Sequence, residues 1–146
     1  MSERITKIKE GIVIDHIEAG RGKEIIDILN LDNIDISYTL GVKYESKTLV
    51  KKDVLKLEVS NLKEHELNKV ALIAPNATIN KISNFNVVSK KKVELPTVID
   101  DVVKCFNPNC ITRHEDVKTK FYVVTKNPLI LRCHYCEKSS SKIELI

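Results

Sequence analysis

The chain has no tryptophan, only 5% aromatic residues and four glycines among its 146 residues. With so few aromatic rings it is poorly equipped to stack successive bases, so single-stranded nucleic acid is not the expected ligand. The glycines are too few to suggest a phosphate-binding loop between a strand and a helix. No apolar run approaches the length of a membrane span. We therefore expect a cytoplasmic protein that has no membrane partner.

Charge is spread evenly along the chain. The 24 lysines and arginines exceed the 20 aspartates and glutamates by four. Residues 1–96 hold 16 basic and 14 acidic side chains, and residues 97–146 hold 8 and 6, so neither part is a dedicated basic domain. Apolar content of 42% and charged content of 30% are typical of globular proteins, and the length allows one ordinary domain or two small ones.

Four cysteines dominate the last third of the chain. Cys105 and Cys110 are separated by four residues, and Cys133 and Cys136 by two, with 22 residues between the pairs. Two such turns can bring four thiolates together around a tetrahedral zinc ion. Four thiolates close the coordination shell, so the sequence predicts one structural Zn²⁺ rather than a catalytic one.

Two other uses of the cysteines are less favoured. Two disulfides would suit a secreted domain, but the sequence has no signal peptide and all four cysteines lie in one short region. A redox motif of the Cys-x2-Cys type would explain Cys133 and Cys136 but would leave the first pair without a role.

Hydrophobic periodicity in the first part predicts alternating strands and helices. Strands are expected at residues 12–17, 34–40, 54–59 and 77–82, with a short fifth at 86–89. Helices are expected at residues 23–31 and from a capping box of Asn61 and Glu64 to Pro75, and a loop at residues 41–52. This β-α-β-β-α-β order predicts an α+β, ferredoxin-like domain, an antiparallel sheet with both helices on one face.

A boundary between two domains is expected near Pro96. Three consecutive lysines at residues 90–92 and the proline are typical of a linker. We therefore predict domains at residues 1–96 and 97–146. Strands expected at residues 98–104, 121–125, 129–131 and 143–146 would make the second a small all-β zinc-binding domain.

Few side chains outside the cysteines suggest chemistry. Asp15 and His16 are adjacent on a predicted strand, so their side chains are expected on opposite faces unless the strand ends there. Nothing nearby supplies a nucleophile to complete a catalytic group. Lys56 is a lone lysine on the polar face of its strand. The residues alone therefore predict a zinc-stabilised module and an α+β domain, but they do not predict a function.

Five segments in order resemble the signatures of one family. They are residues 11–17, 52–58, 74–82, 105–111 and 133–137. The first has the sequence Gly-Ile-Val-Ile-Asp-His-Ile where the family has Gly-Thr-Val-Ile-Asp-His-Ile, and the last two contain the cysteine pairs. Each segment alone is a modest signal, but all five together are specific. Over essentially its whole length, the chain resembles the regulatory chain of bacterial and archaeal aspartate carbamoyltransferase.

The resemblance implies a non-catalytic subunit that binds nucleotide effectors, with CTP as inhibitor and ATP as activator. The residues implied to bind the effector are Ile8, Asp15, His16, Lys56, Asn80, Phe85, Val87 and Lys90. Of these, Asp15 and Lys56 would meet the ribose and base, and His16 and Lys90 the triphosphate. The other four would line the base and sugar site.

The resemblance also implies protein partners. The zinc domain would dock on the catalytic chain, with Asn109 and Glu137 near the contact. Regulatory chains would pair, and three such dimers would bridge two catalytic trimers, so that nucleotides bias a two-state equilibrium.

Two other functions remain open from the residues themselves. A zinc-ribbon nucleic-acid-binding protein would lose oligonucleotide affinity steeply with salt. A small thiol enzyme would need an accessible thiolate of low pKa at Cys133 or Cys136, reactive while metal is bound.

Overall fold

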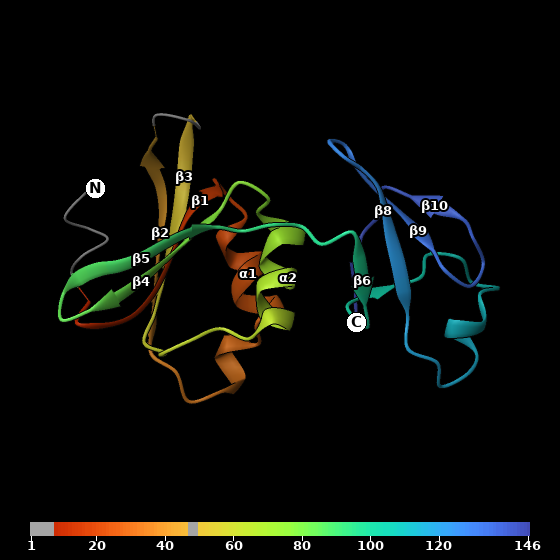
Figure 1. The fold of residues 1–146 in the computed structure, drawn as a ribbon, viewed down its shortest axis with the longest axis horizontal. Helices are drawn as coiled ribbons and strands as arrows, with labels where there is room; N and C mark the ends of the chain where they lie inside the picture. Colours follow the sequence, from red (N-terminus) through yellow and green to blue (C-terminus); the bar gives the residue numbers. More distant parts are fainter. Residues whose placement is uncertain (1–7, 47–49) are drawn as a thin grey trace. The chain divides into compact units, whose positions relative to one another are not determined.

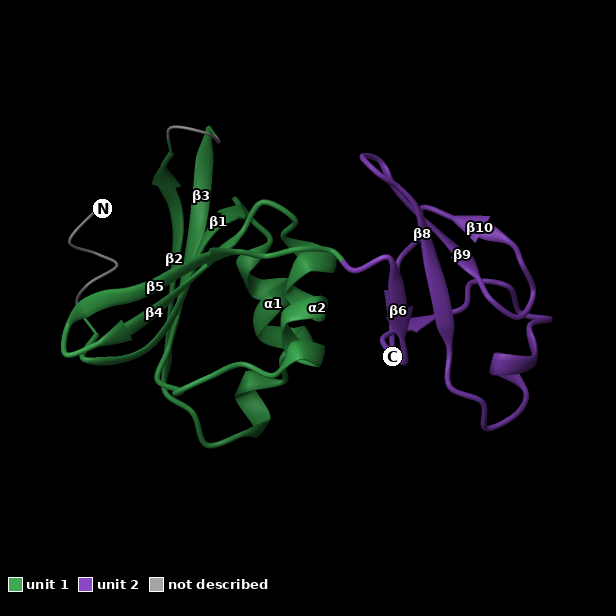
Figure 2. Cartoon of the chain, in the orientation of Figure 1, with its two compact units in different colours: residues 1–95 green, residues 96–146 purple. Residues whose placement is uncertain are grey.

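The computed structural model describes residues 8–46 and 50–146. The chain divides into two compact units, Met1–Leu95 and Pro96–Ile146, called unit 1 and unit 2 here (Figure 2). Within the described residues, no helix combines the length and apolar character needed to cross a membrane.

Unit 1 is built on a five-stranded sheet of order β2-β3-β1-β4-β5, in which every neighbouring pair is antiparallel. Its elements are β1 Glu10–Glu18, α1 Gly22–Ile28, η1 Leu31–Asn33, β2 Tyr38–Glu45, β3 Lys51–Leu57, α2 Glu64–Ile73, β4 Thr78–Ser83 and β5 Asn86–Lys92. Helices α1 and α2 lie against one face of the sheet (Figure 1). The predicted α+β, ferredoxin-like class is confirmed, with β5 as an added edge strand.

The main core of unit 1 lies between the sheet and the helices. Ile14 of β1 pairs with Leu55 of β3, and both side chains are fully buried. Ile25 of α1 and Val70 of α2, also fully buried, supply the helical side of this layer. Burying an aliphatic side chain of this size contributes roughly 1.5–3 kcal/mol, so these few residues hold the helices on the sheet.

The other face of the sheet, called the distal face here, carries a second apolar cluster. Its centre is formed by Val13, Val54 and Ile82. Three partly buried side chains pack against them: Ile8, Tyr44 and Val87. Strand β1 is therefore buried on both faces, as its continuous apolar run predicts for a strand inside a sheet.

Strand β2 begins and ends later than predicted. The expected strand at residues 34–40 is wrong in its first half, because Ile34 is 43% exposed and lies before β2. The loop expected from residue 41 is also wrong, since Gly41 and Tyr44 pair with β3. An edge strand is held by backbone hydrogen bonds on one side and needs no buried face, so its polar sequence resembled a loop.

The predicted cap of α2 is displaced by two residues. The helix starts at Glu64, and its N-cap is Lys63 rather than Asn61. The carboxylate of Glu66, not Glu64, accepts the backbone N–H of the cap residue at 3.0 Å. An acidic residue thus lies three positions after the N-cap, as in a capping box, but both residues come two positions later in the sequence than predicted.

The three lysines predicted to begin the linker belong to β5. Lys90, Lys91 and Lys92 pair with residues 80, 79 and 78 of β4. Lysine on an exposed edge strand discourages pairing with another sheet, which explains a charged run inside a strand. Because side chains alternate along a strand, Lys90 and Lys91 lie on opposite faces of the sheet.

Unit 2 contains a four-stranded antiparallel sheet of order β10-β9-β8-β6 and a small β11-β7 pair. Its elements are β6 Val98–Asp100, β7 Val103–Lys104, η2 Ile111–Arg113, β8 Lys120–Lys126, β9 Leu129–Cys133, β10 Ser139–Ser140 and β11 Glu144–Leu145. Ile99, Phe121 and Leu131 form its buried apolar centre. The single strand expected at residues 98–104 is broken at Asp101, whose φ of 55° lies in the left-handed region.

Candidate functional site

The four cysteines come from an early and a late segment of unit 2 and converge in the structure. Cys105 directly follows β7, and Cys110 directly precedes η2. Cys133 is the last residue of β9, and Cys136 lies in the turn that follows. Two chain segments far apart in sequence therefore present one pair each.

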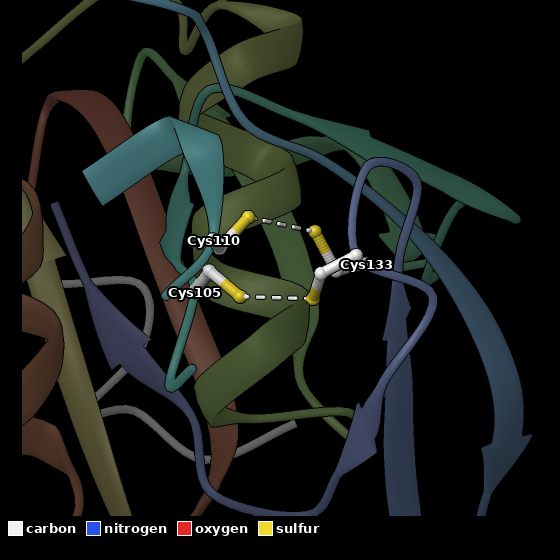
Figure 3. A group of neighbouring side chains, drawn as sticks. Cys105, Cys110 and Cys133 are labelled. Atoms are coloured by element: carbon white, nitrogen blue, oxygen red, sulfur yellow. Dashed lines mark hydrogen bonds between the residues drawn. The ribbon is translucent and has the colours of Figure 1, made fainter. Parts of the chain in front are cut away.

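The sulfur atoms have the spacing of ligands around one ion. All four Sγ atoms lie within 4.8 Å of one another. Cys105 and Cys136 approach to 3.7 Å, and Cys110 and Cys133 also to 3.7 Å (Figure 3). A disulfide requires about 2.05 Å between sulfurs, and all four cysteines are free. The arrangement is that of four thiols aimed at a common centre.

Neighbouring polar groups support the first cysteine pair. The hydroxyl of Thr112 donates to the Cys110 sulfur at 3.2 Å. The guanidinium of Arg113 donates to the carbonyl oxygen of Cys105 at 2.8 Å. Such outer contacts fix the orientation of metal ligands.

The cysteine pKa values differ in the metal-free state. Burial raises the pKa of Cys105 to about 12 and also raises that of Cys133. Burial opposes ionisation of Cys110 as well and is the largest single influence on it. The hydrogen bonds from the side chain and backbone of Thr112 and from the neighbouring cysteines together outweigh burial and lower the pKa of Cys110 to about 7. Because a metal binds thiolates, binding must release the protons of the two raised thiols, and higher pH favours it.

His134 lies between the second pair of cysteines in sequence but points elsewhere. Its Nδ1 is 2.7 Å from the hydroxyl of Tyr122 on β8.

The two residues implied to face a partner lie beside the same turns. The backbone N–H of Asn109 donates to the side chain of the buried Asn107 at 3.1 Å. Glu137 follows the second pair with a φ of 61°, a conformation that glycine adopts more easily.

The distal face of unit 1 gathers polar groups from four strands, and those of three strands lie in one row. Asn80 pairs with Lys90 on one side and with Val13 on the other, and Val13 pairs with Lys56. Directly opposed residues of antiparallel strands share a face. Asp15 lies two residues beyond Val13, opposite residue 78, and so belongs to the same face.

A β-bulge at Asp15 and His16 changes the direction of both side chains. The expectation that they lie on opposite faces is wrong here, because His16 adopts φ 60° and its Nδ1 is 3.9 Å from the Asp15 carboxylate. The same nitrogen lies 3.1 Å from the hydroxyl of Thr78. The Asp15 carboxylate also accepts the backbone N–H of His16 at 2.7 Å. The bulge thus brings an imidazole and a carboxylate together.

Lys52 is the functional candidate that sequence reasoning missed. Its ammonium group lies 2.9 Å from one oxygen of Asp15 and 3.1 Å from the other. Both side chains are largely buried, with 15% and 4% exposed. The sequence predicts a loop at Lys52, but Lys52 shares strand and face with Lys56, four residues further on. The even spacing of Lys52 and Lys56 is the signal in the sequence that could have placed both lysines on one face of a strand.

Asn80 is buried and only half satisfied. Its amide nitrogen donates to the carbonyl oxygen of Val13 at 3.3 Å, whereas its side-chain oxygen has no partner among residues 8–46 and 50–146. An unpaired buried acceptor costs about 1–3 kcal/mol, so a ligand donor placed there would gain that energy.

The apolar residues of the implied effector site lie around the same face. Ile8 and Val87 pack on the distal-face cluster. Phe85 lies in the two-residue turn between β4 and β5 and is 51% exposed, and its backbone N–H donates to the carbonyl of Lys9 at 3.1 Å. This bond ties the turn to the chain segment that enters β1.

The fold and the cysteine centre together define a class of protein: a ferredoxin-like α+β domain followed by a small four-cysteine metal-binding domain. Comparison with known families gives the same division. Residues 3–94 match the allosteric domain of the aspartate carbamoyltransferase regulatory chain, and residues 97–146 match its metal binding domain. The chain belongs to the family of aspartate carbamoyltransferase regulatory chains.

Individual relatives match over nearly the full length. The regulatory chain of Pyrococcus horikoshii is 51% identical over 145 residues, which cover 98% of this chain and 95% of the relative. That of Pyrococcus abyssi is 49% identical over the same shares. That of Methanocaldococcus jannaschii is 43% identical over 140 residues, 96% of this chain and 93% of the relative. Both units of the chain are thus covered by each comparison.

Proposed function

We propose that the chain is a non-catalytic regulatory subunit of aspartate carbamoyltransferase that binds nucleotide effectors on the distal face of unit 1. CTP would inhibit and ATP would activate. The functional domains are residues 1–96, for the effector, and 97–146, for contact with the catalytic chain. The cytoplasm suits this function because its thiols stay reduced.

The row of polar groups across the distal face is the observation that carries the nucleotide proposal. A nucleoside triphosphate needs cations for its phosphates, polar groups for its sugar and apolar surface for its base. His16 and Lys90 are the proposed phosphate contacts, and Asp15 and Lys56 the proposed ribose and base contacts. Asp15 already accepts bonds from Lys52 and its own neighbour, but a carboxylate has about four acceptor sites, so a ribose hydroxyl can still donate to it.

The unpaired oxygen of Asn80 fits a feature that the two proposed effectors share. Cytosine and adenine both carry an exocyclic amino group, which is a hydrogen-bond donor. We propose that this oxygen accepts such a donor, while Ile8, Phe85 and Val87 line the base and sugar.

The proposed metal is a single structural zinc ion. With zinc–sulfur bonds of about 2.3 Å, a regular tetrahedron places its sulfurs about 3.8 Å apart. The two close sulfur pairs, at 3.7 Å, fit this value. Four cysteine ligands leave no open position, so no step of catalysis is assigned to the ion.

Substitution of Lys90 by glutamine tests the nucleotide site. A charge-assisted hydrogen bond contributes about 1.5–3 kcal/mol, so K90Q is expected to weaken CTP and ATP binding by roughly tenfold or more. Isothermal titration calorimetry on the metal-loaded chain measures this. The matched control is K91Q, because Lys91 is its exposed neighbour on the opposite face of β5.

The outcome separates a specific site from general attraction of anions. If K90Q weakens binding and K91Q does not, the phosphates lie on the distal face. Equal losses in both variants, or no binding to the wild-type chain, would contradict the proposed function.

Phe85 gives a second test, in which stability and binding change in opposite directions. Asn84 and Phe85 have φ values of 50° and 65°, which two-residue hairpin turns favour but which a phenylalanine adopts at a cost of about 1–2 kcal/mol. F85G is therefore expected to raise the free energy of unfolding of unit 1 by about 1 kcal/mol and to weaken nucleotide binding. Urea unfolding and calorimetry measure the two effects.

N84G is the control for Phe85, because it alters the neighbouring turn residue without removing an aromatic ring. It should leave affinity unchanged. A stabilised F85G variant that binds nucleotides as tightly as the wild type would exclude Phe85 from the site.

The proposed assembly follows the family. Regulatory chains pair, three dimers bridge two catalytic trimers, and unit 2 docks on the catalytic chain near Asn109 and Glu137. Nucleotide binding would then shift a quaternary equilibrium, and the coupling with substrate binding must be reciprocal. The exposed positions of both residues beside the cysteine turns support this proposal.

A further inference from the structure

The bulge in β1 is a strained conformation, so other contacts must hold the strand in this register. Ile14 pairs with Leu55 and Ile17 pairs with Asp53, so two residues of β1 stand opposite one residue of β3. The extra residue forces His16 into a left-handed conformation that is unfavourable for any residue except glycine. A slip of one position would relieve that strain and would turn the imidazole away from the distal face.

The carboxylate of Asp53 supplies a restraint directly beyond the bulge. Asp53 is 1% exposed. One oxygen accepts the backbone N–H groups of Gly20 and Gly22, both at 3.0 Å. The other accepts the backbone N–H of Lys43 at 3.1 Å. Three backbone donors from two segments therefore meet on one buried side chain.

These hydrogen bonds hold the chain on both sides of β3, after β1 on one side and in β2 on the other. Gly20 lies in the turn after β1 and Gly22 is the first residue of α1, so both groups hold the chain that follows the bulge. Lys43 lies in a second bulge, where the pairing of β2 with β3 shifts between Gly41 and Tyr44. Asp53 thus holds the registers of β1 and β2 against the same strand.

The turn leaves room for this carboxylate and for little else. A Cβ atom added to Gly22 would lie 2.9 Å from the Asp53 oxygen and 2.6 Å from a methyl carbon of Leu40. Any larger residue would push the turn off the carboxylate. The hydrogen bond between the Gly22 N–H and the Asp53 carboxylate therefore depends on glycine at position 22.

We propose that Asp53 is a positioning residue for the effector site: it fixes the register of the end of β1 and thereby holds His16 on the distal face. Asp53 pairs in register with Ile17 and alternates with Lys52, so it lies on the helix side of the sheet and does not touch the ligand. Its neighbour Lys52 holds the bulge from the distal side through Asp15. The functional part of this inference rests on the proposed nucleotide site.

The test uses the full-length, metal-loaded chain with Asp53→Asn, which preserves volume but sets an amide N–H₂ against backbone donors. NMR contacts between His16 and Thr78 report the bulge, and calorimetry reports CTP and ATP affinity. We expect D53N to lose the His16–Thr78 contact and to bind either nucleotide roughly tenfold more weakly.

A control separates positioning from stability. V70A removes buried volume in α2, which contributes none of the bonds to Asp53, and should lower the melting temperature without changing affinity or the His16 contact. If D53N does not fold, Gly22→Ala tests the same link by displacing the turn, with the same expected loss.

The possible outcomes separate this inference from the proposed function. A folded D53N chain that keeps the His16–Thr78 contact overturns the register argument, whatever the wild type binds. A lost contact with unchanged affinity overturns the positioning role. A wild-type chain that binds no nucleotide contradicts the proposed function, while the NMR contact still tests the register.

Discussion

Replacement of Cys133 by serine is expected to unfold unit 2 and to leave unit 1 folded. Unit 2 is small, and units of that size commonly need a metal or disulfides because their core alone is insufficient. Metal-binding free energy is then folding free energy, about 10–16 kcal/mol for structural zinc in small peptides. We expect C133S to hold far less than one equivalent of zinc and to lose amide dispersion in residues 96–146. It should also fail to assemble with catalytic trimers.

Metal analysis, NMR and size-exclusion chromatography with light scattering measure these three effects. The control is H134A, since His134 lies in the same turn but contacts Tyr122. It should retain one equivalent of metal and a folded unit 2. Loss of metal in H134A would make the histidine a ligand. A folded, assembly-competent C133S chain would contradict a structural role for the metal.

Replacement of Lys52 by methionine is expected to destabilise unit 1 by roughly 3 kcal/mol, because it leaves the Asp15 carboxylate buried without its cation. Only 4% of the Asp15 side chain is exposed, so water cannot replace the ammonium group. Urea unfolding followed by NMR signals of unit 1 measures the change. Nucleotide affinity should also fall, since Asp15 would no longer be held in place.

Lys51 provides the matched control for Lys52. It is the preceding residue of β3, but its side chain is 47% exposed and lies 4.0 Å from an exposed glutamate. K51M should change stability by no more than about 0.5 kcal/mol. The double variant D15N/K52M should recover much of the stability, because neither charge remains, yet should not recover nucleotide binding. A K52M chain as stable as K51M would refute the buried ion pair.

The metal centre was predictable from sequence because its determinants are local. Cys105 and Cys110 fall within one turn, and Cys133 and Cys136 within another, so spacing alone indicates the chemistry. The order of strands and helices followed from apolar periodicity in the same way. Both depend on residues near one another in the chain.

The proposed effector site on the distal face depends on pairing across strands, which one sequence does not reveal. Lys90, Asn80 and Lys56 were named together only through resemblance to a family, and the strand registers bring them to one row. The bulge at His16 adds one residue and breaks the period of two, so the alternation rule assigned the wrong face. Lys52 and Asp53 belong to the polar beginning of the inner strand β3, whereas the sequence predicts a loop up to residue 52 and a strand only from residue 54.

The close approach of the cysteines also has a consequence for handling the protein in air. Once the metal is withdrawn, each 3.7 Å sulfur pair is within a small movement of bond formation. Dissolved oxygen can then take two electrons and two protons from each pair and leave two disulfides. A chelated sample would thus become progressively unable to take its ion back. The bound metal therefore acts as a protecting group for the thiols, and a reductant must accompany any attempt to remove and restore it.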